Sequence, residues 1–321
     1  GQEAYDFVDR LVRARQGYWQ VLPLGPTSYG DSPYQSFSAF AGNPYFVDLD
    51  TLASEGLLER GELTSIEWGG TPRSVDYGML YVLRFPVLRA AFARATKREE
   101  CMRALDQFAA ENASWLNDYA LFMALKDENG GVAWENWPYE LRMREESALS
   151  SARERLGESM RFYQYLQYLF YRQWTKLRTY ANEREIKIVG DLPIYVPLDS
   201  ADVWSAPQEF QLDEQRHPRC VAGVPPDYFS ADGQLWGNPI YDWDYMKQTG
   251  YAWWMRRMRS ACTLFDCVRI DHFRGLSSYW SVAADAKTAR EGEWVLGPGA
   301  DFVDRLKESF PGFAIIAAEL G

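Results

Sequence analysis

The sequence predicts an α/β protein, a (β/α)8 barrel of the TIM type. Three segments carry this prediction, because each reads as a helix followed by a short apolar strand that ends in an acidic residue. The strands are "IKIVGDLPIYV" with Asp191, "LFDCVRID" with Asp271 and "FAIIAAEL" with Glu319. Repeated helix-to-strand units form parallel sheets, and barrels of such units carry their site at the carboxyl ends of the strands. We therefore expect these acids to mark the site.

The predicted barrel begins in residues 1–45. An amphipathic helix opens the chain, with an apolar face that holds Ala4, Val8, Leu11 and Val12. A short apolar run, "YWQVLPL", follows and reads as a strand. Residues 27–45 are rich in Gly, Ser, Pro and Tyr, which is typical of a long functional loop. The start of the chain thus supplies a helix, a strand and a loop.

The middle of the chain interrupts this pattern. Residues 46–158 are mostly helical, short and charged, with breaks at "WGGTPRS", "DENGG" and "WENWP", and predict a helical insertion subdomain. The barrel continues over residues 159–321, starting with a helix whose apolar positions repeat with the helical period. Residues 197–245 are thick with Pro, Gly, Asp and aromatics, and predict a loop insertion. The barrel therefore carries long strand-to-helix loops.

Charge and composition exclude several classes of partner. A net charge of −11 repels phosphate backbones and anionic lipid, so nucleic acid and membrane surfaces are poor partners and a neutral ligand is favoured. The four cysteines show no C-x-x-C spacing and there are two histidines, so we expect reduced thiols in a cytoplasm and no metal or organic cofactor. Aromatics make up 16% of residues, which fits either a large aromatic core or rings that stack on sugars.

One strand carries a candidate for chemistry, in "FDCVRIDHFRG". Arg269 and Asp271 share a face if the segment is extended, because alternate strand residues point the same way. A guanidinium within reach favours the ionised carboxylate that a nucleophile needs, although a purely structural pair has the same pattern. His272 faces the other way unless the strand has already ended. It could hydrogen-bond a substrate hydroxyl or serve the structure alone.

Four long segments resemble a known family. They are "YWQVLPLGPTSYGDSPYQSFSAFAGNPY", "GDLPIYVPLDSADVW", "VAGVPPDYFSADGQLWGNPIYDW" and "VRIDHFRG". With smaller matches between them they span nearly the whole chain, and they resemble the 4-alpha-glucanotransferases, the amylomaltase or disproportionating-enzyme family related to the alpha-amylases. The resemblance implies retaining transfer of alpha-1,4-glucan segments between donor and acceptor maltodextrins on a (β/α)8 barrel, inside the cell, through a covalent glycosyl-enzyme.

The resemblance also implies roles for individual residues. Asp271 matches the family's nucleophile, and Arg269 and His272 match its partners around the bound sugar. Asp191 matches a motif position near the same subsite, though it could equally cap the following turn. The remaining matches are Ser32 and Tyr34 on the donor side, and Tyr228, Phe229, Trp236 and Asn238 in "PPDYFSADGQLWGNP", which resembles a loop arching over the cleft. Such a lid excludes water and stacks on sugars, unless its rings only pack the loop.

The last residues depart from the family. Its third motif reads A-E-D-L-G, in which the Glu is the general acid/base. Aligned without a gap, "IIAAELG" puts Ala318 at that Glu and Glu319 at the following Asp. Successive strand residues point apart, so Glu319 would not replace a side chain at 318. A one-residue deletion would instead make Glu319 the acid/base; the ungapped alignment, which keeps the final Leu-Gly in place, implies a Glu→Ala change.

Other departures concern the loops and the ends. Ser277 in "GLSSYW" stands where the family usually carries Glu. Residue 1 falls inside the family pattern, and the chain stops before the region that holds the third carboxylate. We therefore expect an incomplete barrel, truncated at both ends. A glucan-binding protein without catalysis, or an inactive acid/base variant, is one alternative to the transferase, and a plain alpha-glucan hydrolase is another.

Overall fold

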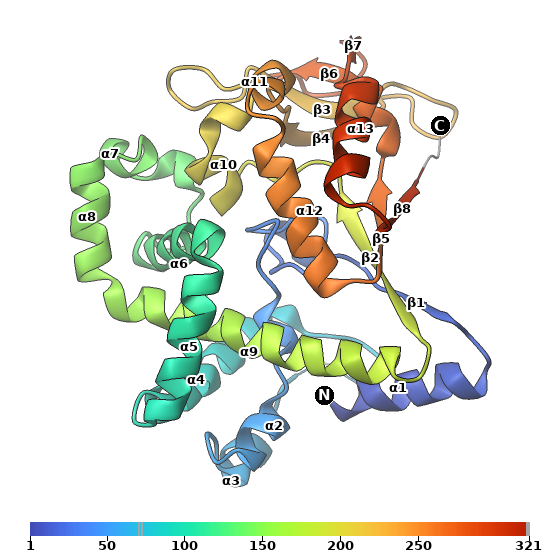
Figure 1. Ribbon diagram of the computed structural model, residues 1–321. Coiled ribbons are helices and arrows are strands. Elements are labelled where there is room, and N and C mark those ends of the chain that lie inside the picture. Colours follow the sequence, from blue (N-terminus) through green and yellow to red (C-terminus); the bar gives the residue numbers. More distant parts are fainter. Residues whose placement is uncertain (70, 72, 319–321) are drawn as a thin grey trace. The chain divides into compact units, whose positions relative to one another are not determined.

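The computed structural model describes residues 1–69, 71 and 73–318 (Figure 1). The chain divides into two compact units. Unit 1 consists of Gly1–Gly17, Ala41–Leu125 and Ala152–Ile186. Unit 2 consists of Tyr18–Phe40, Lys126–Ser151 and Lys187–Gly321.

Unit 1 is helical and is built around one long helix, α9 (Gly157–Asn182). α1 lies beside α9, where the Tyr180 hydroxyl donates to Asp9 Oδ1 at 2.8 Å (Figure 1). The buried side chain of Gln167 accepts from the Gly42 amide at 2.7 Å and donates to the Gly42 carbonyl at 2.9 Å. α9 thus holds the backbone at Gly42 in place. The other elements are α1 (Gln2–Arg13), η2 (Pro44–Phe46), α2 (Leu49–Ser54), α3 (Arg60–Thr64), α4 (Tyr77–Ala95), α5 (Glu99–Glu111) and most of α6 (Ala113–Glu128).

Unit 2 contains the parallel sheet that the sequence predicts. Its strands are β1 (Tyr18–Gln20), β2 (Lys187–Pro193), β5 (Cys267–Asp271) and β8 (Ala314–Ala317), in the order β1-β2-β5-β8 and all parallel. α12 (Ala252–Leu264) leads into β5 and α13 (Gly299–Ser309) leads into β8, so the helix-to-strand units are confirmed. Parallel strands end at the same edge of a sheet, and the register there pairs Pro193 with Asp271.

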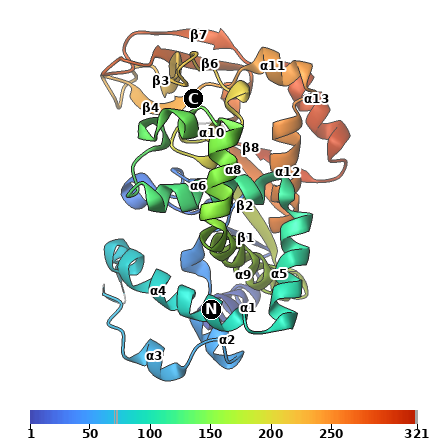
Figure 2. The same ribbon diagram turned by 90° about the vertical axis from the view of Figure 1, so that its left-hand side faces the viewer.

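A second, antiparallel sheet in unit 2 has the order β4-β3-β6-β7 (Figure 2). Its strands are β3 (Cys220–Val224), β4 (Gln234–Pro239), β6 (Ser278–Ala283) and β7 (Gly292–Leu296). Residues 197–245 therefore hold two strands, with α10 (Ala201–Ser205), η4 (Pro207–Glu209) and part of α11 (Trp243–Gln248), where the sequence predicts a loop. β3 is short and pairs with β6, far along the chain, so its local pattern gives little signal. The remaining elements are η1 (Tyr29–Asp31), η3 (Trp134–Asn136), α7 (Tyr139–Arg142), α8 (Glu146–Arg155) and η5 (Phe273–Leu276).

Gly190, in the middle of β2, has no room for a side chain. A Cβ there would lie 2.3 Å from the ring of Phe265, which precedes β5. We expect Gly190→Ala to lower the free energy of unfolding by about 1–3 kcal/mol, because overpacking displaces well-packed neighbours. Urea unfolding followed by circular dichroism measures this. Gly17→Ala is the control, since nothing lies within 4 Å of its Cβ position; equal effects would contradict the packing argument.

Candidate active site

The carboxyl ends of β2 and β5 bring two carboxylates onto one guanidinium. Arg269 Nη1 donates to Asp191 Oδ1 at 2.7 Å, and Arg269 Nη2 donates to Asp271 Oδ1 at 2.6 Å. The strand register pairs Asp191 with Arg269, so these two side chains share a face. Arg269 and Asp271 lie on one face of β5, as the alternation in the sequence predicts. The Asp191 side chain is 1% exposed and that of Asp271 is 34% exposed. Asp271 is therefore the carboxylate that a substrate can reach.

Tyr34 completes this cluster from a distant part of the chain. Its hydroxyl donates to Asp191 Oδ2 at 2.7 Å, so both Asp191 oxygens are engaged. Ser32 orients Tyr34 locally, because its hydroxyl accepts from the Tyr34 amide at 3.3 Å. The four side chains Tyr34, Asp191, Arg269 and Asp271, called the carboxylate cluster below, form one chain of hydrogen bonds.

The charges in the carboxylate cluster support one another. Burial raises the pKa of Tyr34 to about 12, with further contributions from its hydrogen bond to Asp191 and from the nearby negative charges. Tyr34 therefore keeps its proton and donates at neutral pH. Burial alone lowers the pKa of Arg269, but the charges of Asp191 and Asp271 raise it above the ordinary value. Arg269 is thus a fixed cation that donates a hydrogen bond to each of the two carboxylates.

His272 leaves the strand at once, because β5 ends at Asp271. It adopts the left-handed conformation, with φ 53° and ψ 46°, at the start of η5. Histidine is among the non-glycine residues that enter this region most readily. The turn brings its ring 4.9 Å from the centroid of Trp236 on β4, with the rings nearly perpendicular. The end of β5 therefore holds the Asp271 carboxylate and the His272 imidazole, and the Trp236 indole of β4 packs against that imidazole.

Position 318 lies beside Asp271. The Ala318 amide donates to the Ile270 carbonyl at 3.1 Å and the Ala318 carbonyl accepts from the Phe273 amide at 3.1 Å. The β5–β8 register pairs Ile270 with Ala317, so its next step sets Ala318 against Asp271 on the same face of the sheet. Glu319 lies outside the described residues.

The predicted lid residues lie on the second sheet and its hairpin. Tyr228 and Phe229, at the tip between β3 and β4, are 97% and 93% exposed and contact each other edge-on at 5.6 Å. Asp227 builds this tip, because its carboxylate accepts from the amides of Phe229 and Ser230. Asn238, on β4, is buried. The structure therefore brings Trp236 to His272 but leaves the two tip rings in solvent.

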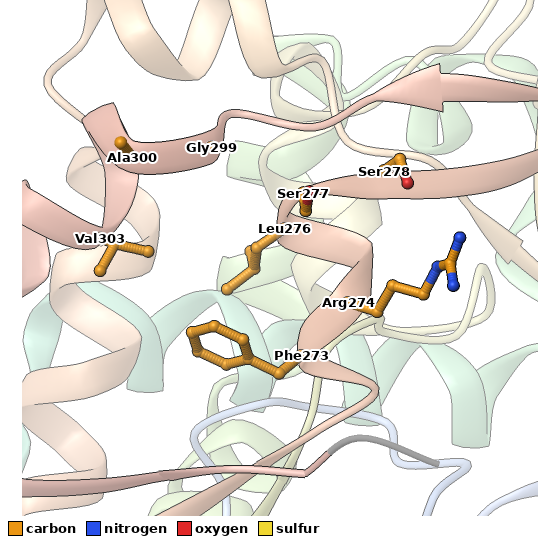
Figure 3. Close-up of a pocket in the computed structure, with 8 residues that line it drawn as sticks. All are labelled: Phe273, Arg274, Leu276, Ser277, Ser278, Gly299, Ala300 and Val303. Carbon is orange, nitrogen blue, oxygen red and sulfur yellow. The ribbon is translucent and has the colours of Figure 1, made fainter. Parts of the chain in front are cut away.

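A cavity of about 450 Å³ lies between η5 and the first turns of α13 (Figure 3). The side chains of Phe273, Leu276 and Val303 point toward one another in it, whereas Arg274 points away (Figure 3). The Arg274 guanidinium lies 4.3 Å from the centroid of the Trp294 ring. No residue of the carboxylate cluster lines this cavity. The candidate site is therefore the strand edge and not this cavity.

Residues 1–69, 71 and 73–318 contain no group of three or more His, Cys, Asp or Glu side chains placed to hold a metal ion. No helix among the same residues is long and apolar enough to cross a membrane.

Comparison with known proteins places this chain in a family. The glycoside hydrolase family 77 profile, described as 4-alpha-glucanotransferase, matches residues 1–321. The chain is 50% identical over 322 residues to a 4-alpha-glucanotransferase of Streptococcus pneumoniae serotype 4 and 50% identical over 325 residues to one of Thermus thermophilus. Each match covers 100% of this chain and 64% of the relative. The chain belongs to the 4-alpha-glucanotransferase family, and it spans about two thirds of the length of these relatives.

A solved structure agrees with this assignment. The amylomaltase from Streptococcus agalactiae in complex with acarbose superimposes with a TM-score of 0.97 and 46% identity, over 100% of this chain and 65% of that one. The predicted family is confirmed, as is the predicted fold class of an α/β barrel of which this chain holds a part.

Proposed function

We propose that this chain carries the donor-side catalytic centre of a 4-alpha-glucanotransferase that acts on alpha-1,4-glucans. The observation that carries the proposal is the partly exposed Asp271 carboxylate, held by Arg269 at 2.6 Å at the end of a parallel strand. Maltodextrins would serve as donor and acceptor. The cysteines of the described chain are free thiols, which supports a cytoplasmic location.

In the first step, an Asp271 oxygen attacks the anomeric carbon of a glucan. A C–O bond to the carboxylate forms while the bond to the leaving 4-oxygen breaks. Arg269 stays bound to Oδ1 and holds the carboxylate oriented. Tyr34 and Asp191 would fix Arg269 from its other side and line the donor subsite. His272 would hydrogen-bond a hydroxyl of the same sugar.

The leaving oxygen needs a proton, and the acceptor hydroxyl later needs a base. Retaining enzymes use one carboxyl group for both, about 5–5.5 Å from the nucleophile. Position 318 lies next to Asp271 on the adjacent strand and on the same face of the sheet. Neighbouring strands lie about 4.8 Å apart, which is close to that carboxyl separation. Ala318 itself can neither give nor take a proton. Asp271 would therefore attack well only a donor whose leaving group needs no proton.

The rings of the β3–β4 hairpin would cover the acceptor. Tyr228 and Phe229 stand free at its tip, and Trp236 stands beside His272. A lid of rings stacks on a sugar acceptor and keeps water away from the glycosyl-enzyme, which favours transfer over hydrolysis. Asn238 would support the base of this lid.

An intact-protein mass spectrum before and after incubation with alpha-maltosyl fluoride tests the proposal. Fluoride leaves without protonation, so we expect a persistent maltosyl adduct, mapped by peptide digestion to Asp271. Adduct formation without turnover is expected because deglycosylation lacks its base. If neither an adduct nor elongated maltodextrins formed, the chain would not be a glycosyl-transferring enzyme.

A second candidate is a glucan-binding protein without catalysis, which Ala318 favours. It predicts that maltotriose quenches tryptophan fluorescence while the fluoride donor leaves the mass of the protein unchanged. Maltosylation of Asp271 would eliminate it.

A further inference from the structure

Tyr34 is presented by a loop with a closed stem, residues 26–40, called the Tyr34 loop below. The Ser28 amide donates to the Gln35 carbonyl at 2.8 Å, and the Phe37 amide donates to the Pro26 carbonyl at 3.3 Å. These bonds tie the two sides of the stem together, so a shift of the stem moves the tip that carries Tyr34.

The first turn of α10 holds the stem from outside. The Ala201 amide donates to the Phe37 carbonyl at 2.8 Å. Two residues on, the Ala39 amide donates to Asp202 Oδ2 at 2.7 Å. Asp202 is 4% exposed, so water cannot replace this bond. The Tyr34 loop is therefore anchored on a buried carboxylate.

A buried cation holds the end of β2 in the same unit. Arg257 on α12 donates from Nη2 to the Pro193 carbonyl at 2.5 Å and from Nη1 to the Ile194 carbonyl at 3.1 Å. Its guanidinium lies 4.8 Å over the ring of Trp254. Pro193 follows Asp191 by two residues. Arg257 thus fixes the strand end that supplies the hydrogen-bond partner of Tyr34.

Asp202 and Arg257 act on each other electrostatically. Burial is the largest influence on the pKa of Asp202, and the smaller opposing effects of the Ala39 amide, Arg257 and Arg256 leave that pKa raised to about 6. Burial lowers the pKa of Arg257, while Tyr241 and Asp202 raise it. Asp202 is therefore ionised at pH 7.5 and largely protonated at pH 5. A carboxylate accepts a stronger hydrogen bond than a carboxylic acid does.

Protonation of Asp202 has opposite effects on the free energy of folding and on the hydrogen bond from Ala39. A carboxyl group whose pKa is higher in the folded state than in the unfolded state binds more protons when folded. Asp202 therefore makes folding more favourable as the pH falls from about 6 toward 4. The Ala39 bond weakens over the same range. Acid should therefore loosen the Tyr34 loop even though protonation of Asp202 itself favours the folded state.

We propose that Asp202 is a positioning residue of the transfer reaction, which holds the Tyr34 loop so that Tyr34 meets Asp191 and which releases that loop when it is protonated. The inference rests on the proposed function. It assigns Asp202 no contact with substrate, and it makes the donor side of the site sensitive to mild acid.

The first test is the rate at which maltosyl fluoride labels Asp271, measured by intact mass from pH 5 to 8. We expect Asp202→Asn to slow labelling about tenfold at pH 7.5, because a neutral amide replaces a charged acceptor. We expect the labelling rate of the wild type to fall near pH 6 and the rate of the variant to show no such fall. The control is Asp304→Asn, an exposed change on α13. A wild-type acid limb retained in Asp202→Asn would overturn the proposal.

The second test asks whether Asp202 acts through Tyr34. We expect Tyr34→Phe to slow labelling, and Asp202→Asn to slow it no further in the Tyr34→Phe background. Leu306→Ala, in the buried face of α13, is the comparator for a merely structural change. Its effect on the labelling rate should be independent of Tyr34→Phe, so the double variant should be slowed by the product of the two single factors. If Asp202→Asn slowed labelling by the same factor in the Tyr34→Phe background as in wild type, Asp202 would not act through Tyr34 and its proposed role would be overturned.

A third measurement needs no activity. Amide hydrogen exchange of Ala39, corrected for the intrinsic pH dependence, should speed up about tenfold in Asp202→Asn and in wild type at pH 5. Unchanged protection of Ala39 would overturn the anchor. An unlabelled wild type would overturn the proposed function and with it the catalytic role, while the exchange data would still decide the anchor.

Discussion

Replacing Ala318 by glutamate is expected to raise transfer from maltotriose by about 10²–10⁴-fold, the usual contribution of a positioned general acid or base. The reason is the strand register. Ala318 follows the pair of Ile270 and Ala317 and shares a face with Asp271. A carboxyl group there could protonate the leaving oxygen and then deprotonate the acceptor. Glucose and longer maltodextrins, separated by chromatography, measure the gain.

The matched control is Ala317→Glu, which puts the same carboxyl group one residue earlier on the same strand. Successive strand residues point to opposite faces, so it should not raise transfer. The Ala318→Glu variant should also lose the persistent maltosyl adduct, because deglycosylation regains a base. If Ala318→Glu had no effect while Glu319→Gln abolished residual transfer, the acid/base would be Glu319 and the gapped alignment would hold.

The parts of this site that follow from local spacing could be predicted from the sequence. Alternation along β5 placed Arg269 beside Asp271, and the structure confirms that contact at 2.6 Å. The helix-to-strand pattern likewise gave the parallel sheet. His272 shows the limit of this reasoning. The direction of the His272 side chain depends on whether the strand has ended before it, and only the left-handed backbone at His272 in the structure decides that.

Contacts between distant segments could not be read from spacing. Tyr34 reaches Asp191 across 157 residues of chain, and no local period encodes that pairing. The same holds for the second sheet, where β3 finds β6. Asp202 lies inside a quoted motif, but nothing in the pattern distinguishes it from a capping residue. Arg257 sits in an ordinary amphipathic helix, and its burial against Trp254 gives the signal that the sequence lacks.

Replacing Asp271 by asparagine in the unaltered chain is expected to abolish the maltosyl adduct. In the Ala318→Glu background the same change is expected to lower transfer by about 10⁴-fold or more. The amide keeps the shape of the side chain and a hydrogen-bond acceptor for Arg269, but it cannot form the glycosyl ester. Arg269 also keeps its bond to Asp191, so the cluster should stay folded. Intact mass and chromatography of products measure the two losses.

The control separates the loss of a nucleophile from the loss of a charge. Asp304→Asn removes one exposed carboxylate from the same unit and should leave labelling unchanged. An adduct that survived in Asp271→Asn would place the nucleophile elsewhere, and peptide mapping would name the residue. Asp191 is the nearest other carboxylate on Arg269, but its side chain is 1% exposed and both of its oxygens are already engaged. The exposure of Asp271 is therefore what makes it the expected nucleophile.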